Sequence, residues 1–456
     1  MADVDRRRLA EALARERDAY ATARPRSRAA AAEAAEHLVG GVPMTWMAKW
    51  AGGFPLFLAE AHGNRVTDLD GHTYVDLALG DTGAMAGHAP PATVEAITRH
   101  LREVGAATAM LPTTDAAWVA GELARRFGVP RWSFALTATD ANRWALRLAR
   151  LVTGRPLVAS FAYGYHGTVD ETFVVRDPAG ATVARPGNVA PAVDPATTTR
   201  ALEWNDLTSV EAALEPGDVA VVLTEPALTN IGIVLPERGF LEGLRAACDR
   251  TGTLLLVDET HTLSAGPGGC TAAWGLRPDL VTLGKALAGG IPIGAYGLSA
   301  EVADRLAERV AATGADLVDV GGVGGTLAGN ALSLAAARAT LDEVLTDDAF
   351  ARMIALATRF TDGVQATIDR HGLPWSVVQL GARAEYRFAD PPPRTGTASA
   401  AAGDDDVEEL LHLALANRGI LLTPFHNMAL MCPNTTEADV GRHTDAFAEV
   451  VASIAG

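Results

Sequence analysis

Short apolar runs recur through the middle of the chain, separated by segments with helical spacing. The runs RWSFAL, RPLVASF, VAVVLTEP, TLLLVDE, PDLVTLG and IGAYGLS predict strands. Amphipathic segments such as DANRWALRLARLVTG and RGFLEGLRAACDRTG lie between several of them and predict helices. Strands that alternate with helices are typical of a mostly parallel sheet with both faces covered, so we expect an α/β fold.

The pattern changes on both sides of this region. Residues 1–38 predict helices interrupted near Pro25, and PLFLAEAHGNRVTDLDGHTYVDL predicts two strands joined by a turn at Asp70-Gly71. After GGVGGTLAGN come a long helix and the weaker strands of WSVVQLGARAEYRF and GILLTPF. We therefore expect an N-terminal arm and part of a small domain in residues 1–65, a large domain in 66–325, and the C-terminal α+β small domain in 326–456. PPPRTGTASAAAGDDD, residues 391–406, predicts a mobile surface loop.

Composition restricts the partners of the protein. The 456 residues are enough for two domains. A net charge of -17 argues against general binding of nucleic acid or of anionic membranes, and no apolar run is long enough to cross a bilayer. The three cysteines are widely spaced and match neither a disulfide framework nor a zinc site. No pattern of metal ligands lies beside His166. The N-terminus lacks the apolar core of a signal peptide, so we expect a cytoplasmic protein without a metal site.

Asp258 and Lys285 each follow an apolar run in the stretch Thr253–Gly290. TLLLVDE ends in an acid, and LVTLGKALAGG carries a lysine followed by small residues. Because the carboxyl ends of parallel strands meet at one edge of the sheet, we expect both side chains to face one pocket. This arrangement suits pyridoxal 5'-phosphate (PLP): the lysine forms a Schiff base with the aldehyde, and the carboxylate keeps the pyridine nitrogen protonated. The alternative is an Asp that caps its strand and a solvated Lys.

Further candidate ligands follow the other predicted strands. Thr137-Ala138-Thr139 lies between a strand and a helix, where free N–H groups and two hydroxyls favour a phosphate, although Thr is also an ordinary N-cap. Tyr165 is placed to stack on a ring, with packing under its loop as the alternative. Asn230 offers a donor for a phenolic oxygen, and Glu225 offers a hydrogen bond to a neighbour. Thr326, in a glycine-rich loop, supplies another hydroxyl for a phosphate.

The order of these residues resembles the class III (fold type I) PLP-dependent aminotransferases, especially the branch of glutamate-1-semialdehyde aminomutase and β-amino acid aminotransferases. The resemblance runs from about Gly40 to the C-terminus, and its specific pieces are GGFPLFLAEAHGNRVTDLDGHTYVDL, YHG, EPALTNIGIVLPERGFLEGLR, VDE, TLGKALAGG and GTLAGN. It implies a PLP-binding large domain with a mostly parallel, seven-stranded type of sheet. Lys285 is then the Schiff-base lysine, Asp258 the pyridinium partner and Tyr165 the stacking aromatic. Thr326 is implied to reach the phosphate of the other subunit, which means a homodimer with shared active sites.

The chain departs from the family at cofactor positions. Ala138 stands where Gly is usual, and Asp140 where Glu is usual, beside the expected phosphate. Thr260 stands where a valine packs behind the ring, and His261 follows it. We count Thr260 and His261 among the cofactor-binding residues.

Departures also affect the substrate. Relatives often carry an arginine that holds a substrate carboxylate in the loop matching GGVPMTWMAKW, where this chain has Trp46 and Met47, and no arginine lies around His426. Arg383 is our candidate replacement. The alternative is a surface arginine paired with Glu385.

We expect a transaminase that moves an amino group between an amine or amino acid, such as a β-amino acid, and a keto acid, aldehyde or ketone. The alternative is an intramolecular aminomutase or epimerase of the glutamate-1-semialdehyde aminomutase type, which needs no keto acid acceptor. A non-catalytic relative also remains open because of the altered phosphate loop. A nicotinamide oxidoreductase is disfavoured because no GxGxxG with a following acid is present.

Overall fold

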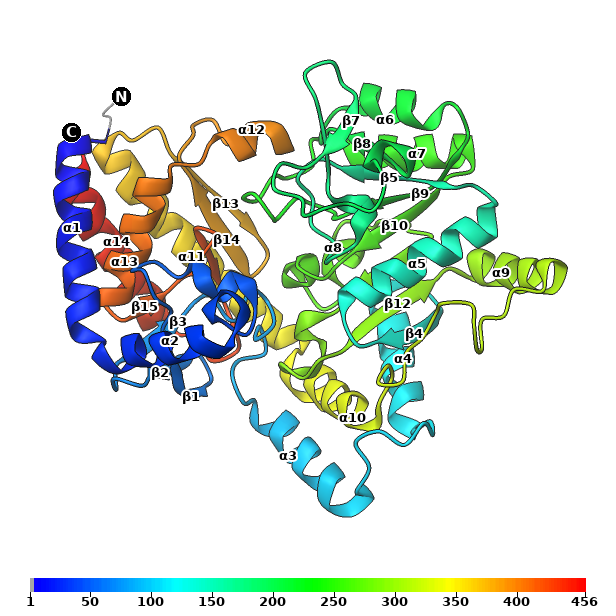
Figure 1. Cartoon of the computed structure of the whole chain (residues 1–456), viewed down its shortest axis with the longest axis horizontal. Coiled ribbons are helices and arrows are strands. Elements are labelled where there is room, and N and C mark those ends of the chain that lie inside the picture. The colour runs from blue at the N-terminus through cyan, green and yellow to red at the C-terminus, as the bar shows by residue number, and fades with distance from the viewer. Residues whose placement is uncertain (1–3) are drawn as a thin grey trace. The chain divides into compact units, whose positions relative to one another are not determined.

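The structure is a computed structural model that describes residues 4–456. The chain forms two compact units (Figure 1). Unit 2 comprises Pro91–Asp347 and Arg394–Ala400. Unit 1 comprises the described chain up to Pro90 together with Asp348–Pro393 and Ala401–Gly456.

A seven-stranded sheet forms the centre of unit 2. Its order is β4-β12-β11-β10-β9-β5-β8, and neighbours run parallel except at β12, which is antiparallel to β4 and β11. The expected α/β fold with a mostly parallel sheet is confirmed. The strands are β4 (Arg131–Ala135), β5 (Leu157–Phe161), β8 (Thr199–Leu202), β9 (Val219–Thr224), β10 (Leu254–Asp258), β11 (Leu280–Leu283) and β12 (Gly294–Leu298).

Helices cover both faces of this sheet. Successive residues of a strand point to opposite sides, so a strand made only of apolar residues needs cover on both faces. Leu254 and Leu256 of β10 share a core cluster with α5, whereas Leu255 and Val257 share another with α6 and α7. The helices of unit 2 are α3 (Pro91–Arg99), α4 (Thr114–Phe127), α5 (Ala138–Thr153), α6 (Leu207–Leu214), α7 (Phe240–Thr251), α8 (Gly269–Ala273), α9 (Ala300–Thr313) and α10 (Ala331–Ala339). A small hairpin of β6 (Val174–Arg176) and β7 (Thr182–Ala184) is separate from the main sheet.

Unit 1 contains two smaller sheets. One has the order β1-β2-β3-β15, and the other β13-β14-β16. The expected hairpin at Asp70-Gly71 joins β2 to β3, and Gly71 has the positive φ of 90° that such a turn requires. The strands are β1 (Leu58–His62), β2 (Arg65–Asp68), β3 (Thr73–Asp76), β13 (Ser376–Leu380), β14 (Arg383–Arg387), β15 (Ile420–Leu421) and β16 (Met428–Leu430); the helices are α1 (Arg6–Ala23), α2 (Pro25–His37), α11 (Asp347–His371), α13 (Asp405–Asn417) and α14 (Glu437–Ile454).

The compact units divide the chain at other positions than the expected domain boundaries, 65/66 and 325/326. Residues 66–90 belong to unit 1 because β3 pairs in parallel with β15, from the C-terminal part of the chain. Residues 326–347 belong to unit 2 because α10 packs against α3 and α4. Contacts between segments that are distant in sequence decide both boundaries.

The prediction of a surface loop for residues 391–406 is wrong for residues 396–401 and 405–406, which are helical. Gly396–Ala401 forms α12, in which Ser399 is buried and donates to the carbonyl of Ile231. Asp404 is the N-cap of α13 and accepts a hydrogen bond from the amide of Val407 at 3.3 Å. Carboxylates are favourable in the first turn of a helix, so the run of aspartates begins a helix there.

No helix between residues 4 and 456 has both the length and the apolar character needed to cross a membrane. The same residues contain no group of three or more His, Cys, Asp or Glu side chains arranged to hold a metal ion. The three cysteines are buried and unpaired with one another.

Candidate functional site

The carboxylate of Asp258, the last residue of β10, is 2% exposed and held by three hydrogen-bond partners. Oδ2 accepts from Nδ2 of Asn142 at 2.8 Å and lies 3.0 Å from Nδ1 of His166, while Oδ1 accepts from the amide of Thr260 at 3.0 Å. Burial alone raises the pKa of a carboxyl group, but the contacts from His166, Thr260 and Asn142 outweigh it, so the pKa of Asp258 is lowered. Asp258 is therefore a buried, ionised acid.

Asn142, which we did not predict, organises this acid. Besides Asp258, its Nδ2 donates to the carbonyl of His166 at 3.0 Å, and its Oδ1 accepts from the hydroxyl of Thr282 at 2.6 Å. The residue is fully buried on α5, on the face that otherwise buries alanines and leucines. A polar amide at an apolar-periodic position of α5 was the available sequence signal, since buried amides need partners.

Lys285 follows β11 and begins the 3-10 helix η7 (Lys285–Ala288). Its Nζ lies 2.8 Å from Nε2 of His261. Its backbone has a positive φ of 49°, which is uncommon for a residue with a side chain and is often retained where function requires it. β10 and β11 are parallel, with Asp258 opposite Thr282, so Asp258 and Lys285 leave neighbouring strands at the same edge of the sheet.

The turn after Asp258 is anchored by the next acid, Glu259. Its carboxylate accepts from the amide and hydroxyl of Thr271 at 2.5 and 2.6 Å and from the amide of Cys270 at 3.1 Å. Complete burial raises the pKa of Glu259. These bonds fix the segment that carries Thr260 and His261, which are 6% and 7% exposed. The Thr260 hydroxyl is buried without a hydrogen-bond partner in the described chain, so a ligand group could satisfy it.

The segment Thr137–Thr139 forms the N-terminal end of α5. Thr137 is the N-cap, and its hydroxyl accepts from the amide of Asp140 at 3.1 Å. The hydroxyl of Thr139 accepts from the amide of Thr168 at 3.1 Å. A side chain at Gly294 would lie 2.2 Å from the carbonyl oxygen of Thr137, so β12 approaches this segment closely. The result is a rigid helix N-terminus with hydroxyls beside it, which suits a phosphate group.

The other predicted cofactor residues lie in loops of unit 2. The half-buried ring of Tyr165 packs edge-on against Phe173, with centroids 6.3 Å apart. Asn230 donates from Nδ2 to the carbonyl of Tyr163 at 3.2 Å, and the buried Glu225 accepts from the hydroxyl of Thr229. Thr326 is exposed in the segment before α10. Asn230 is thus used to hold the loop that precedes Tyr165.

The predicted substrate residues all belong to unit 1. The half-buried Trp46 packs against Phe425 with ring centroids 5.4 Å apart, and Met47 is 41% exposed. Arg383 is fully buried, with Nη2 4.0 Å from Oδ1 of Asp81. The alternative of a surface arginine is therefore wrong.

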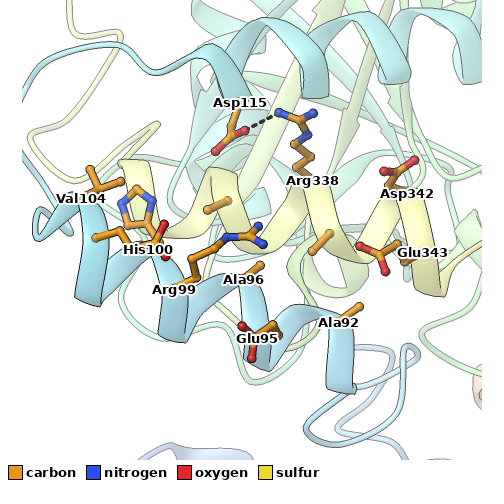
Figure 2. A pocket seen from close by; sticks show the side chains of 13 residues that line it. Ala92, Glu95, Ala96, Arg99, His100, Val104, Asp115, Arg338, Asp342 and Glu343 are labelled. Carbon is orange, nitrogen blue, oxygen red and sulfur yellow. Dashed lines mark hydrogen bonds and ion pairs between the residues drawn. The ribbon is translucent and has the colours of Figure 1, made fainter.

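A cavity of about 540 Å³ lies between α3 and α10 of unit 2 (Figure 2). Its lining is mostly charged, and Arg338 donates to Asp115 there at 2.8 Å. None of the predicted site residues lines it.

The residues around Asp258 and Lys285 fit PLP. No lysine or arginine of residues 4–456 pairs with Asp258, which leaves its charge for a cationic ring nitrogen. Lys285 supplies an amine for an aldehyde, and the N-terminus of α5 supplies donors for a phosphate.

Comparisons with known proteins agree with this fit. The family model for class III aminotransferases matches residues 46–451. A glutamate-1-semialdehyde 2,1-aminomutase of Chloroflexus aggregans is 34% identical over 444 residues, which cover 94% of this chain and 98% of that protein.

Two solved structures are similar over nearly the whole chain. A glutamate-1-semialdehyde aminomutase from Pseudomonas aeruginosa PAO1 has a TM-score of 0.95 and 48% identity, covering 99% of each chain, and a variant of it was solved with PMP. A β-phenylalanine aminotransferase from Variovorax paradoxus has a TM-score of 0.85 and 26% identity, covering 97% of each chain.

Proposed function

The chain belongs to the class III aminotransferases and is a PLP-dependent enzyme, and within this family we propose that it is an intramolecular aminomutase. Such an enzyme moves an amino group between neighbouring carbons of one substrate, and the substrate that we propose resembles glutamate-1-semialdehyde. The observation that carries this proposal is the 48% identity over 99% of the chain to the P. aeruginosa protein of that name. The comparisons thus favour the activity that the sequence analysis kept as its alternative.

PLP supplies an aldehyde carbon and an electron-withdrawing ring. Asp258 would pair with the ring nitrogen and keep it protonated, while His166 and Asn142 orient its carboxylate through contacts at 3.0 and 2.8 Å. The N-terminus of α5, with Thr137 and Thr139, binds the phosphate.

Lys285 would hold the cofactor between turnovers, and its Nζ would move the proton during them. His261 lies 2.8 Å from Nζ and orients the amine. Tyr165 would stack on the ring of the bound cofactor, and Thr260 would stand behind the ring, where relatives usually have a valine.

A transaminase with a separate carbonyl acceptor is the second candidate. Trp46 and Met47 occupy the loop where relatives carry a carboxylate-binding arginine, which favours a substrate with an aromatic or aliphatic body. The similarity to the V. paradoxus β-phenylalanine aminotransferase supports the same candidate.

We also propose a homodimer with shared active sites, in which Thr326 reaches the phosphate of the partner. Unit 2 exposes large apolar side chains near this residue in sequence: Val318 is 98% exposed, Val320 80% and Leu327 51%. Apolar side chains gathered on a surface are typical of an interface, and a second copy of the chain is the partner that we expect.

The deciding experiment supplies one substrate at a time to the PLP-loaded enzyme. An aminomutase converts glutamate-1-semialdehyde to its amino-ketone isomer without any added keto acid, whereas a transaminase consumes β-phenylalanine only when a keto acid is present. Isomer formation in the absence of an acceptor supports the proposal. Strict dependence on an acceptor for every substrate contradicts it.

Lys285→Ala provides the control for this assay. We expect it to abolish turnover with either substrate, because the group that moves the proton is lost. Turnover near the wild-type rate would remove the whole assignment.

A further inference from the structure

Arg185 is a half-buried arginine that has no acidic partner in the described part of the chain. It follows β7, and its backbone amide donates to the carbonyl of Phe173 at 2.8 Å. Its guanidinium carbon lies 5.4 Å from the ring centroid of Tyr163, and Nη1 lies 3.5 Å from the carbonyl of Gly164. Within residues 4–456, no Asp or Glu carboxylate makes an ion pair with it.

The buried arginines of the described chain contrast with Arg185. Each of them lies within 4.0 Å of a carboxylate; the pairs are Arg24 with Asp68 at 3.8 Å, Arg126 with Glu122 at 2.7 Å, Arg383 with Asp81 at 4.0 Å, and Arg387 with Glu408 at 3.6 Å. Removing a charge from water is costly unless a partner compensates for it. Burial lowers the pKa of Arg185, and only the phenols of Tyr163 and Tyr165 act in the other direction. Residues 4–456 therefore supply no carboxylate beside this guanidinium.

Arg185 packs on the segment that leads into the candidate site. Gly164, whose carbonyl it approaches, is followed by Tyr165, the proposed stacking residue, and by His166, which contacts Asp258 at 3.0 Å. Asn230 holds the same segment through the carbonyl of Tyr163. An anion at Arg185 would thus be bound by the loop that also positions the cofactor ring.

We propose that Arg185 binds the carboxylate of the substrate. The inference rests on the proposed function, since glutamate-1-semialdehyde carries a carboxylate, as do the β-amino acids of the second candidate activity. A planar guanidinium binds a carboxylate through two parallel hydrogen bonds, so it fixes orientation as well as charge. It would supply the clamp that the loop around Trp46 lacks. Substrates without a carboxylate would then bind poorly.

Besides the substrate carboxylate, the phosphate of bound PLP is a second anion that Arg185 could bind. The N-terminus of α5 with Thr137 and Thr139 already offers that group a set of donors. The experiment therefore measures carboxylate binding and cofactor binding separately.

The test uses the PLP-loaded enzyme and needs no turnover. Pentanoate and 3-phenylpropanoate are titrated into wild type, Arg185→Met and Arg185→Lys, and binding is followed by calorimetry and by the visible absorption of the bound cofactor. The uncharged probes are pentanamide and 3-phenylpropanamide. We expect Arg185→Met to weaken binding of the carboxylates by about 30-fold or more, and Arg185→Lys to weaken it by about tenfold, with the amides unaffected.

Arg155→Met is the matched control. Arg155 is also half-buried in unit 2, but it is held by the carbonyls of Thr251 and Val219 at 2.9 and 3.1 Å. This variant reports the cost of removing a half-buried arginine, and we expect carboxylate affinity as in wild type.

Three results would overturn the inference: carboxylate affinity of Arg185→Met equal to that of wild type, a loss of PLP affinity without a loss of carboxylate affinity, or no carboxylate binding by wild type. Failure of the proposed function is a separate result. In that case the wild type binds carboxylates and PLP but forms no isomer from glutamate-1-semialdehyde.

Discussion

Asp258 in unit 2 and Glu385 in unit 1 are both buried carboxylates beside a histidine. Asp258 lies 3.0 Å from Nδ1 of His166, and Glu385 lies 3.3 Å from Nδ1 of His426. Burial favours a raised pKa at both acids, yet the pKa of each is lowered by its surroundings. The two pairs therefore look alike at the level of acid and histidine.

Their remaining neighbours differ. Arg383 and Arg387 lie two residues to either side of Glu385 on β14, so they share its face of the strand, and together with His426 they lower its pKa. Asp258 has Asn142 and a backbone amide instead. Glu385 has two arginines beside it, whereas no arginine or lysine of residues 4–456 pairs with Asp258, and we infer that its charge serves a cationic ligand. A buried acid indicates a ligand site only when the chain does not supply its counter-charge.

The strongest challenge to this distinction is Asp258→Asn. The amide keeps the shape but cannot hold a proton on the ring nitrogen, so we expect kcat/KM to fall about a thousandfold, with the thermal midpoint nearly unchanged. Steady-state kinetics and thermal unfolding of the same preparation measure both. Activity within a few-fold of wild type would show that the charge of Asp258 does not serve the cofactor.

The equivalent change in unit 1, Glu385→Gln, should lower the stability of the protein and leave cofactor binding unchanged. It leaves Arg383 and Arg387 buried with less negative charge around them, and we expect the free energy of unfolding to fall by about 3 kcal/mol. Denaturant unfolding measures the loss, and the visible absorption of the bound PLP should stay as in wild type. Unchanged stability together with lost cofactor absorption would reverse the roles of the two acids.

His443 on α14 is also buried but, unlike His166 and His426, has no acid partner in the described chain. It shows how a buried histidine behaves without such a partner. Both ring nitrogens lack a hydrogen-bond partner in the described chain, and burial lowers the pKa of His443 from 6.5 to about 3. The folded state then binds fewer protons than the unfolded state below pH 6.5, so stability falls as the pH decreases from 6.5 toward 3.

His443→Leu should remove this dependence. At pH 7 we expect a gain of about 1 kcal/mol, because a buried polar ring without partners is replaced by an apolar side chain of similar size. At pH 5 the gain should be about 2 kcal/mol larger, since each pH unit below 6.5 costs the wild type about 1.4 kcal/mol. Denaturant unfolding at both pH values measures this, with the exposed His37 changed to Leu as control. Equal gains at pH 7 and pH 5 would contradict the shifted pKa.

Much of the fold followed from local pattern. Continuous apolar runs predicted β9, β10 and β11, every residue of which is buried, and Asp70-Gly71 predicted the hairpin of β2 and β3. β8 was missed because TRAL is short and contains the charged Arg200. The helical parts of residues 391–406 were missed because proline and aspartate favour loops and helix starts alike.

The sequence by itself determined which strand ends carry an acid, an amine and hydroxyls, because apolar runs and their flanking residues are local features. Only the tertiary structure decided which charges find a partner, since Arg383 meets Asp81, and Asn142 meets Asp258, from distant parts of the chain. Among residues 4–456, folding likewise brings no arginine or lysine to Asp258 and no aspartate or glutamate to Arg185. An ion pair between distant residues exists only once the backbone has brought both ends together.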